Sequence, residues 1–241
     1  MDESSRLQYL KAMGVQVWQS SAEAAQTIVE SEIKPEPALP QQEAVQAVQA
    51  ADPSHTWACL QSEVSRCTAC SLHQSRIQTV FGAGDGAADW MVIGEAPGAS
   101  EDQQGEPFVG RAGLLLNEML RAIGLTREQV FITNSLKCRP PGNRDPQADE
   151  VKACESFLKR QIKWLQPRLI LAVGRVAAQN LLKVTTPLGK LRGQAHAYEG
   201  IPLVVIYHPA YLLRSPLEKR KAWDDLCFAL NLYKSLSSPD E

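Results

Sequence analysis

Long hydrophobic runs are missing from this sequence of 241 residues. No stretch of about 18 consecutive apolar residues occurs, so no segment is predicted to cross a membrane. The first six residues, Met1 to Arg6, have neither the basic region nor the apolar core of a secretory signal. We therefore expect a reducing compartment and a cytoplasmic location.

A strong charge of either sign is also missing, because 25 basic and 27 acidic residues leave a net charge of −2. The charges are unevenly distributed. Residues 1–54 hold eight acids and three bases, whereas the remainder holds 19 acids and 22 bases. A weakly basic body permits nucleic-acid binding without requiring it.

Aromatic residues are absent from residues 20–52, which are rich in Ala, Gln, Glu and Pro. Such a segment cannot bury enough apolar surface to order itself. We therefore predict an acidic, disordered tail over residues 1–54, with a short helix over 4–18; a docking helix for a protein partner is the alternative. One domain is expected over 55–236, followed by a tail over 237–241, and we expect a monomer.

Strand-like and helix-like segments alternate through the body. The predicted strands cover residues 90–95, 129–134, 168–173 and 202–207. The predicted helices cover residues 56–66, 112–123, 147–164, 175–183 and 218–236. This alternation predicts an α/β fold, a three-layer α/β/α sandwich around a central, mainly parallel sheet of four strands.

Polar, conformationally constrained residues follow two of these strands. Gly94–Gly98 comes directly after an apolar run, and His208–Arg214 comes after another. Open α/β sheets bind ligands at the carboxyl ends of their strands, so the two segments predict one active site. Neither segment is specific alone, because many strand-to-helix turns contain two glycines and most histidines at strand ends are structural.

Four cysteines form a second group, which begins with a CxxC pair. In a chain without a secretory leader, such a group points to a metal or an iron-sulfur cluster rather than to disulfides. The spacing does not decide between zinc and a [4Fe-4S] cluster. The four are Cys67, Cys70, Cys138 and Cys154. Cys59 and Cys227 fall outside the group and are expected to be buried thiols.

Three segments, residues 94–116, 132–146 and 208–214, together with the four cysteines in this order, closely resemble the family 4 uracil-DNA glycosylases. The similarity covers roughly residues 55–235. It implies a DNA repair enzyme that hydrolyses the N-glycosidic bond of uracil in single- or double-stranded DNA, leaving an abasic site to start base excision repair. It also implies a [4Fe-4S] cluster, mainly structural, on the four cysteines.

The resemblance assigns the base-reading residues. Phe108 would stack on the extruded uracil, and the carboxamide of Asn134 would read its edge. One amide can donate to O4 of uracil and accept from N3–H, whereas cytosine presents the opposite pattern. Buried polar groups left unpaired by the wrong base can give a selectivity of roughly 10⁴-fold.

The resemblance also suggests how the bond is broken. A neutral His208 could donate a hydrogen bond to O2 of the departing uracil, which carries negative charge in the transition state. Glu95, with the backbone of Ala96, would lie near the base, and Glu101 and Asn143 match other positions in the pocket. Sequence alone leaves open which of Glu95, Glu101 and Asn143 positions the attacking water.

Contacts to the duplex are predicted from the third segment. Leu212 and Leu213 fit an apolar wedge on a loop that fills the gap left by the flipped nucleotide, and Arg214 fits a phosphate contact. Taken alone, Leu-Leu-Arg is more typical of a core or a helix start. The additional candidates for phosphate contacts are Arg111, Lys137, Arg139 and Arg144.

Two other functions remain open at this point. One is a catalytically inactive iron-sulfur protein that binds DNA as a replication accessory. The other is a zinc-stabilised hydrolase of free nucleotides. No lysine occupies a nucleophile position in the motifs, so a lyase step is not expected.

Overall fold

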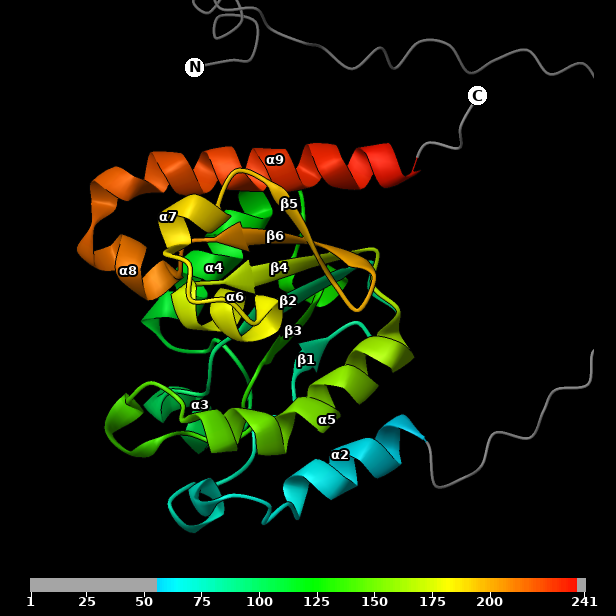
Figure 1. Cartoon of the computed structure of the whole chain (residues 1–241), viewed down its shortest axis with the longest axis vertical. Coiled ribbons are helices and arrows are strands. Elements are labelled where there is room, and N and C mark those ends of the chain that lie inside the picture. The colour runs from blue at the N-terminus through cyan, green and yellow to red at the C-terminus, as the bar shows by residue number, and fades with distance from the viewer. Residues whose placement is uncertain (1–55, 238–241) are drawn as a thin grey trace, which may run out of the picture. The chain divides into compact units, whose positions relative to one another are not determined.

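The computed structural model describes residues 56–237, and Figure 1 shows their arrangement. The chain divides into two units, residues 1–47 and 48–241, and all the described residues belong to the second. The predicted tail over residues 1–54, with its short helix, lies outside the described residues. The domain boundaries therefore stay predictions.

A mixed, mostly parallel sheet of six strands forms the centre of the fold (Figure 1). The strand order is β1-β3-β2-β4-β6-β5, and β3, β2, β4 and β6 run parallel to one another. The strands are β1 (Ala83–Gly84), β2 (Trp90–Gly94), β3 (Phe131–Asn134), β4 (Leu169–Val173), β5 (Ala195–Tyr198) and β6 (Ile201–Ile206). The four parallel strands are the predicted ones, and their carboxyl ends meet at one edge.

The predicted number of four strands is wrong, because two edge strands were missed. β1 and β5 each pair antiparallel with a neighbouring parallel strand. β1 has two residues, and β5 lies mostly at the surface with the sequence Ala-His-Ala-Tyr. Short or exposed edge strands lack the apolar run by which buried strands are recognised.

The five predicted helices are present, and several shorter helices were not expected. The predicted ones are α2 (Trp57–Ser65), α4 (Arg111–Ala122), α5 (Ala148–Leu165), α6 (Arg175–Leu182) and α9 (Lys219–Ser237). The shorter α-helices are α3 (Ala99–Gln104), α7 (Leu188–Leu191) and α8 (Pro209–Arg214). The 3₁₀ helices are η2 (Ser71–Gln74), η3 (Arg127–Gln129), η4 (Pro141–Asn143) and η5 (Pro216–Glu218).

Alternate side chains of each strand pack into separate cores on the two faces of the sheet. Met91 and Ile93 of β2 belong to one core, to which α2, α5 and α6 contribute. Trp90 and Val92 belong to the other, to which α4, α8 and α9 contribute. Helices therefore cover both faces, and the edge where the parallel strands end is left for the loops.

A third, smaller core lies outside these two. It joins Leu72 of η2 and Leu136, which follows β3, to Cys138 and Cys154. Ala96, which follows β2, packs against it. Among the helices of residues 56–237, none is both long and apolar enough to cross a membrane.

Candidate active site

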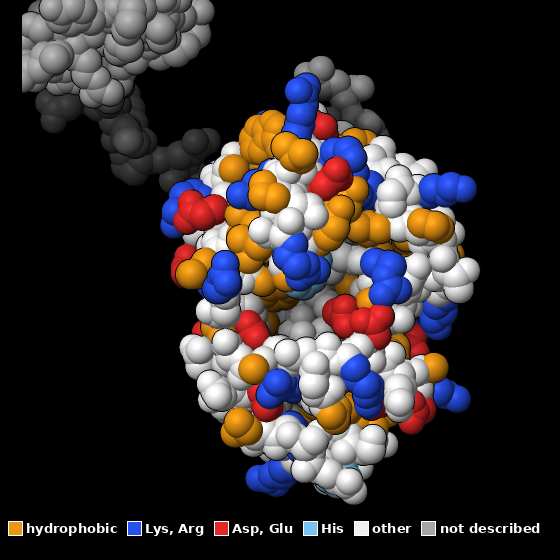
Figure 2. All heavy atoms as spheres, turned by 90° about the vertical axis from the view of Figure 1, so that its left-hand side faces the viewer, with side chains coloured by type: hydrophobic (Ala, Val, Ile, Leu, Met, Phe, Trp, Pro, Cys, Tyr) orange, Lys and Arg blue, Asp and Glu red, His pale blue; other side chains and the backbone are white. Residues whose placement is uncertain are grey.

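A cavity of about 730 Å³ opens at the carboxyl ends of the four parallel strands. Figure 2 faces this side of the molecule, which is hollowed at its centre and carries Lys and Arg side chains, together with Asp and Glu side chains, around the hollow. We call this cavity the strand-end cavity. The predicted site residues that line it are Glu95, Ala96, Glu101, Phe108, Asn134, Asn143, Arg144, His208 and Arg214. The structure thus brings the separate motifs together in one site.

Asn134 is the last residue of β3 and lies at the bottom of the cavity. It is 2% exposed, and its side-chain Oδ1 is buried without a hydrogen-bond partner among the described residues. The parallel register places it beside Gly94, where a Cβ would lie 2.3 Å from this Oδ1. A buried carboxamide oxygen without a partner is costly, so the site is suited to a ligand that donates a hydrogen bond.

Phe108 lies on the loop between α3 and α4 and forms another wall. Its buried ring is 5.8 Å from the ring of His208, with an angle of 31° between the two planes. A Cβ on Gly94 would come within 2.7 Å of Cζ of Phe108. The absence of a side chain at Gly94 therefore provides the space between the amide of Asn134 and the aromatic ring.

His208 is the N-cap of α8, directly after β6. Its Nδ1 accepts a hydrogen bond from the backbone N–H of Ala210 (3.1 Å), so the proton of the neutral ring lies on Nε2. Burial, with a smaller contribution from Arg214, lowers the pKa of His208 to about 4. The imidazole is therefore neutral near pH 7 and can donate through Nε2.

Gly174, which follows β4, allows this position of His208. Its φ is +90°, and a Cβ there would lie 2.9 Å from Cβ of His208. Glycine adopts this backbone conformation without strain and leaves room for the imidazole. The ends of β4 and β6 are thereby packed directly against each other.

The three candidates for positioning water differ in their surroundings. Burial, and then the charge of Asp145, raise the pKa of Glu95 to about 7, while Arg175 lowers it. The carboxylate of Glu101 accepts from the backbone N–H groups of Gly98, Val109 and Gly110 at 3.0 to 3.1 Å. Oδ1 of Asn143 accepts from Nε of Arg139 at 2.7 Å.

The segment from His208 to Arg214 differs in part from the prediction of a loop. It continues as the helix α8, on which Leu212 is only 1% exposed and packs in the core. Leu213 is 38% exposed, and Arg214 lies at the surface and lines the cavity. The prediction that both leucines form the wedge is therefore wrong for Leu212, because it packs in the core to which α4 and α9 also contribute.

The prediction that Lys137 contacts phosphates is also wrong. Lys137 is 1% exposed, and its ammonium group donates to Oγ1 of Thr133, the carbonyl of Asn134 and Oε1 of Gln161, at 2.6 to 2.8 Å. Desolvation lowers its pKa to about 7. A buried amine with three acceptors is a structural link rather than a DNA contact.

The other basic candidates are nearer the surface. Arg144 is held by the buried carboxylate of Glu150, with contacts of 2.6 and 2.9 Å. Arg139 is partly exposed and bonds Asn143, as described above. Arg111, at the start of α4, is exposed. These three remain candidates for phosphate contacts.

Arg175 was missed by the sequence analysis. It follows β4 and Gly174, lines the cavity and pairs with Asp145 across a distance of 2.7 Å. Tyr207 and Tyr211, whose rings stack at 5.1 Å, line the cavity as well. The predicted strand 168–173 carried the necessary signal, because the residues after a parallel strand lie at the same edge as His208.

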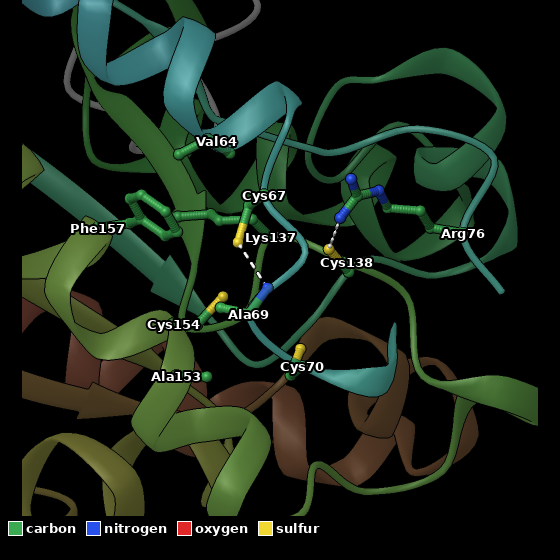
Figure 3. A pocket seen from close by; sticks show the side chains of 10 residues that line it. All are labelled: Val64, Cys67, Ala69, Cys70, Arg76, Lys137, Cys138, Ala153, Cys154 and Phe157. Atoms are coloured by element: carbon green, nitrogen blue, oxygen red, sulfur yellow. Dashed lines mark hydrogen bonds between the residues drawn. The ribbon is translucent and has the colours of Figure 1, made fainter. Parts of the chain in front are cut away.

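The four predicted metal ligands line one small cavity, shown in Figure 3. Their sulfur atoms face a common space, and we call this group, Cys67, Cys70, Cys138 and Cys154, the cysteine cage. Nη1 of Arg76 donates to Sγ of Cys138 at 3.1 Å, and the backbone N–H of Ala69 donates to Sγ of Cys67 at 3.5 Å. The group predicted from the sequence is therefore brought together.

The two cysteines outside the cage are partly exposed. Cys59 and Cys227 were expected to be buried, but both have intermediate exposure. Across residues 56–237, no three His, Cys, Asp or Glu side chains are placed to hold a single metal ion.

Comparisons with known proteins identify the family of the chain. The family model of the uracil DNA glycosylase superfamily matches residues 81–227. The type-4 uracil-DNA glycosylase of Archaeoglobus fulgidus is 45% identical over 162 residues, covering 64% of this chain and 81% of that protein. That of Pyrobaculum aerophilum is 43% identical over 173 residues, covering 68% and 87%. That of Saccharolobus solfataricus is 45% identical over 163 residues, covering 64% and 76%. With identities of this size over most of the relatives' length, the chain belongs to the type-4 uracil-DNA glycosylases of the uracil DNA glycosylase superfamily.

Proposed function

We propose that the chain is a monofunctional uracil-DNA glycosylase that hydrolyses the N-glycosidic bond of uracil in DNA. It releases free uracil and leaves an abasic site, which starts base excision repair. The observation that carries this conclusion is the buried Oδ1 of Asn134, which has no partner among the described residues and lies beside the ring of Phe108 in the strand-end cavity.

The carboxamide of Asn134 is suited to select uracil. Its Oδ1 would accept from N3–H of uracil, and its amide nitrogen would donate to O4. Cytosine has an unprotonated N3 and an amino group at these positions, so both contacts would be unpaired in a buried site. A site of this kind can reject the wrong base by roughly 10⁴-fold.

His208 is suited to stabilise the departing base. The hydrogen bond that Nδ1 receives from Ala210 leaves Nε2–H as the donor, and the low pKa keeps the ring neutral. A neutral donor aimed at O2 of uracil gains most when negative charge develops on the base. We therefore assign His208 to the leaving group and Phe108 to stacking on the extruded ring.

Among the three candidates for activating water, the surroundings favour Glu95. The carboxylate of Glu101 already accepts three backbone N–H groups, and Asn143 is engaged by Arg139. Glu95 lines the cavity and has a pKa of about 7, near the value at which a general base is most effective. Its carboxylate would orient the water and stabilise the cationic sugar.

Two surface residues beside the cavity fit contacts to DNA. Leu213 is the exposed leucine of α8, and it could enter the space from which the nucleotide is extruded. Arg214 follows it at the rim and could contact a phosphate. Both assignments place the duplex across the face seen in Figure 2.

We assign a [4Fe-4S] cluster rather than zinc to the cysteine cage, as the resemblance to the type-4 enzymes implies. One zinc ion would draw four thiolates to about 2.3 Å, whereas each iron of a four-iron cluster takes one thiolate. The cage offers sulfur donors only, one from each of four cysteines that line a common space. When bound, the cluster would supply structural cross-links between η2, the segment after β3 and α5.

The test uses the full-length, cluster-loaded protein and a uracil-containing oligonucleotide, followed by alkali. We expect an alkali-labile site with both single- and double-stranded substrates. Asn134→Ala and His208→Ala should each reduce the excision rate by about 100-fold or more while DNA binding is retained. His196→Ala is the matched control, because His196 bonds the carbonyl of Leu191 and does not line the cavity.

The outcomes separate this function from the alternatives. Tight binding of uracil-containing DNA without any excision would support an inactive DNA-binding protein instead. Inhibition by free nucleotide but not by duplex DNA would support a nucleotide hydrolase. Either result would overturn the proposal.

A further inference from the structure

The backbone of Phe108 has an unusual conformation. Its φ is +53°, in the left-handed region that residues other than glycine rarely adopt. A bulky residue is strained there, and the conformation persists only where surrounding contacts enforce it. The contacts around this peptide therefore identify what positions the aromatic ring.

Charged side chains hold the chain on both sides of Phe108. Arg127 donates from Nη1 to the carbonyl of Phe108 (3.2 Å) and from Nη2 to the carbonyl of Pro107. Oε1 of Glu101 accepts from the N–H groups of the next two residues, Val109 and Gly110, both at 3.0 Å. The guanidinium group thus donates to the two carbonyls, and the carboxylate accepts from the two N–H groups that follow them in the chain.

The first turn of α4 closes the remaining side. A Cβ on Gly113 would lie only 1.7 Å from the carbonyl oxygen of Phe108, so the helix backbone approaches this peptide directly. The oxygen is therefore confined between α4 and the guanidinium group of Arg127. A charge-assisted hydrogen bond at such a position is stronger than a neutral one.

Arg127 links two parts of the cavity, the strand that carries Asn134 and the loop that carries Phe108. It is the first residue of η3, which leads directly into β3, and β3 ends at Asn134. Its side chain is partly buried, whereas that of Arg121, on α4, is exposed. The segment that carries the amide at one end therefore fixes the aromatic loop at the other.

We propose that Arg127 is the positioning residue that holds Phe108 in its strained conformation and so keeps the ring ready to stack on the extruded base. The proposal rests on the proposed role of the cavity in uracil recognition. Without the guanidinium group, the carbonyls of Pro107 and Phe108 lose their donors. Phe108 then relaxes to negative φ, and its ring leaves the place beside His208.

The first experiment compares Arg127→Gln with Arg127→Lys and with the exposed control Arg121→Gln, in full-length, cluster-loaded protein. We expect Arg127→Gln to lower the single-turnover excision rate at saturating enzyme by about 10- to 100-fold, with the Kd for DNA unchanged. Arg127→Lys should recover part of the rate, because an ammonium group can bond one carbonyl. Arg121→Gln should match the wild type. An unchanged rate in Arg127→Gln would overturn the proposal.

A double-mutant cycle tests whether Arg127 acts through the ring. In a Phe108→Ala background, Arg127→Gln should cause no further loss, because the group it positions is gone. A general weakening of the fold would reduce the rate again by the same factor. Additive losses would therefore contradict the positioning role.

A crystal structure of the Arg127→Gln variant, or of Arg127→Lys if the first does not fold, provides a readout independent of activity. We expect negative φ at Phe108 and a displaced ring in Arg127→Gln, and a smaller displacement of the ring in Arg127→Lys. Retention of the ring and of φ near +53° would overturn the proposal. Displacement of the ring together with a wild type that excises no uracil would instead leave the positioning role intact and refute the proposed function.

Discussion

The strand-end cavity and the cysteine cage lie at opposite ends of one short segment, Asn134 to Cys138, yet they are built in opposite ways. The cavity measures about 730 Å³ and contains a buried carboxamide oxygen without a partner among the described residues. The cage is small, and its two buried thiols, Cys138 and Cys154, pack with Leu72 and Leu136. The cavity therefore leaves a polar group available for a ligand, whereas the cysteines are held in place by packing.

Lys137 connects the two regions. Its ammonium group donates to the carbonyl of Asn134 and to Thr133 and Gln161, and the next residue is Cys138. A buried, fully bonded amine is rigid. The position of the base-reading amide is thus tied to the cage, although no group of the cage lines the cavity. Substitutions in the cavity should affect catalysis, and substitutions in the cage should affect the stability of the fold first.

Gly94→Ala should show most clearly that a substitution in the cavity lowers the excision rate without lowering the stability of the fold. The new Cβ would lie 2.3 Å from Oδ1 of Asn134 and 2.7 Å from Cζ of Phe108, so one of these side chains must move. Displacement of a reacting or recognising group by about 1 Å can cost 100-fold, and we expect at least about this loss in the excision rate. The melting temperature should change little, because both neighbours are side-chain ends at the cavity.

Gly86→Ala is the matched control for this substitution. A Cβ at Gly86 would meet nothing within 4 Å, and the described backbone there is not in the left-handed region. Excision by this variant should equal that of the wild type. Wild-type excision by Gly94→Ala would show that the space beside Asn134 is not where the base binds.

The pH dependence of excision tests the electrostatics of the cavity. The pKa of Glu95 is raised to about 7, so its carboxylate form increases as the pH rises through 7. If Glu95 acts as a base, the rate should rise over this range and then level off. His208, with a pKa of about 4, should add no further step above about pH 5.

Glu95→Gln should remove this rise and lower the rate at pH 8 by about 100-fold. Glu118→Gln, at an exposed position of α4, provides the control and should keep the wild-type profile. A rate that falls as the pH rises through 7 would mean that the protonated form of Glu95 is the active one. That result would contradict its role as a base.

Cys67→Ala should lower the stability of the fold more than the excision rate, which is the reverse of what we expect for the cavity variants. Removal of one cage thiol should abolish the visible absorbance of the cluster and lower the melting temperature by about 10 °C. Excision at 25 °C should fall less, by about tenfold, because the cage acts on Asn134 only through the intervening segment. Cys227→Ala, which replaces a thiol of similar exposure outside the cage, should retain the absorbance. A zinc content of one per chain, without visible absorbance in the wild type, would refute the cluster.

The parts of the fold and of the site that could be predicted from the sequence are those that a local sequence pattern marks. The four buried parallel strands and the convergence of Glu95, Asn134 and His208 were predictable, because apolar runs mark buried strands and parallel strands end at one edge. The edge strands β1 and β5 lack that signal and were missed. Arg175 was missed although it follows a predicted strand.

Other outcomes depended on packing that no local pattern reveals. Leu212 and Leu213 are chemically identical neighbours, and only the packing of α8 beside α4 decides that the first is buried. Lys137 has the sequence surroundings of a surface base, with Arg139 two residues away, but its ammonium group is buried by contacts with two residues of β3, Thr133 and Asn134, and with Gln161 of the distant helix α5. Residue type predicted the chemistry of the site, whereas tertiary contacts decided which side chains are available for it.

Leu213→Ala should give the smallest effect, at the outer rim of the cavity. If Leu213 fills the gap left by the extruded nucleotide, excision from double-stranded DNA should fall by about five- to tenfold, because an apolar contact is lost when the stack is open. Single-stranded substrate has no such gap, and its excision should hardly change. Leu236→Ala is a close control, because Leu236 is 40% exposed, as Leu213 is 38% exposed, but lies near the end of α9. Equal losses on both substrates would place Leu213 in general DNA binding or folding rather than in the wedge, and the rim would then be no different from the rest of the surface.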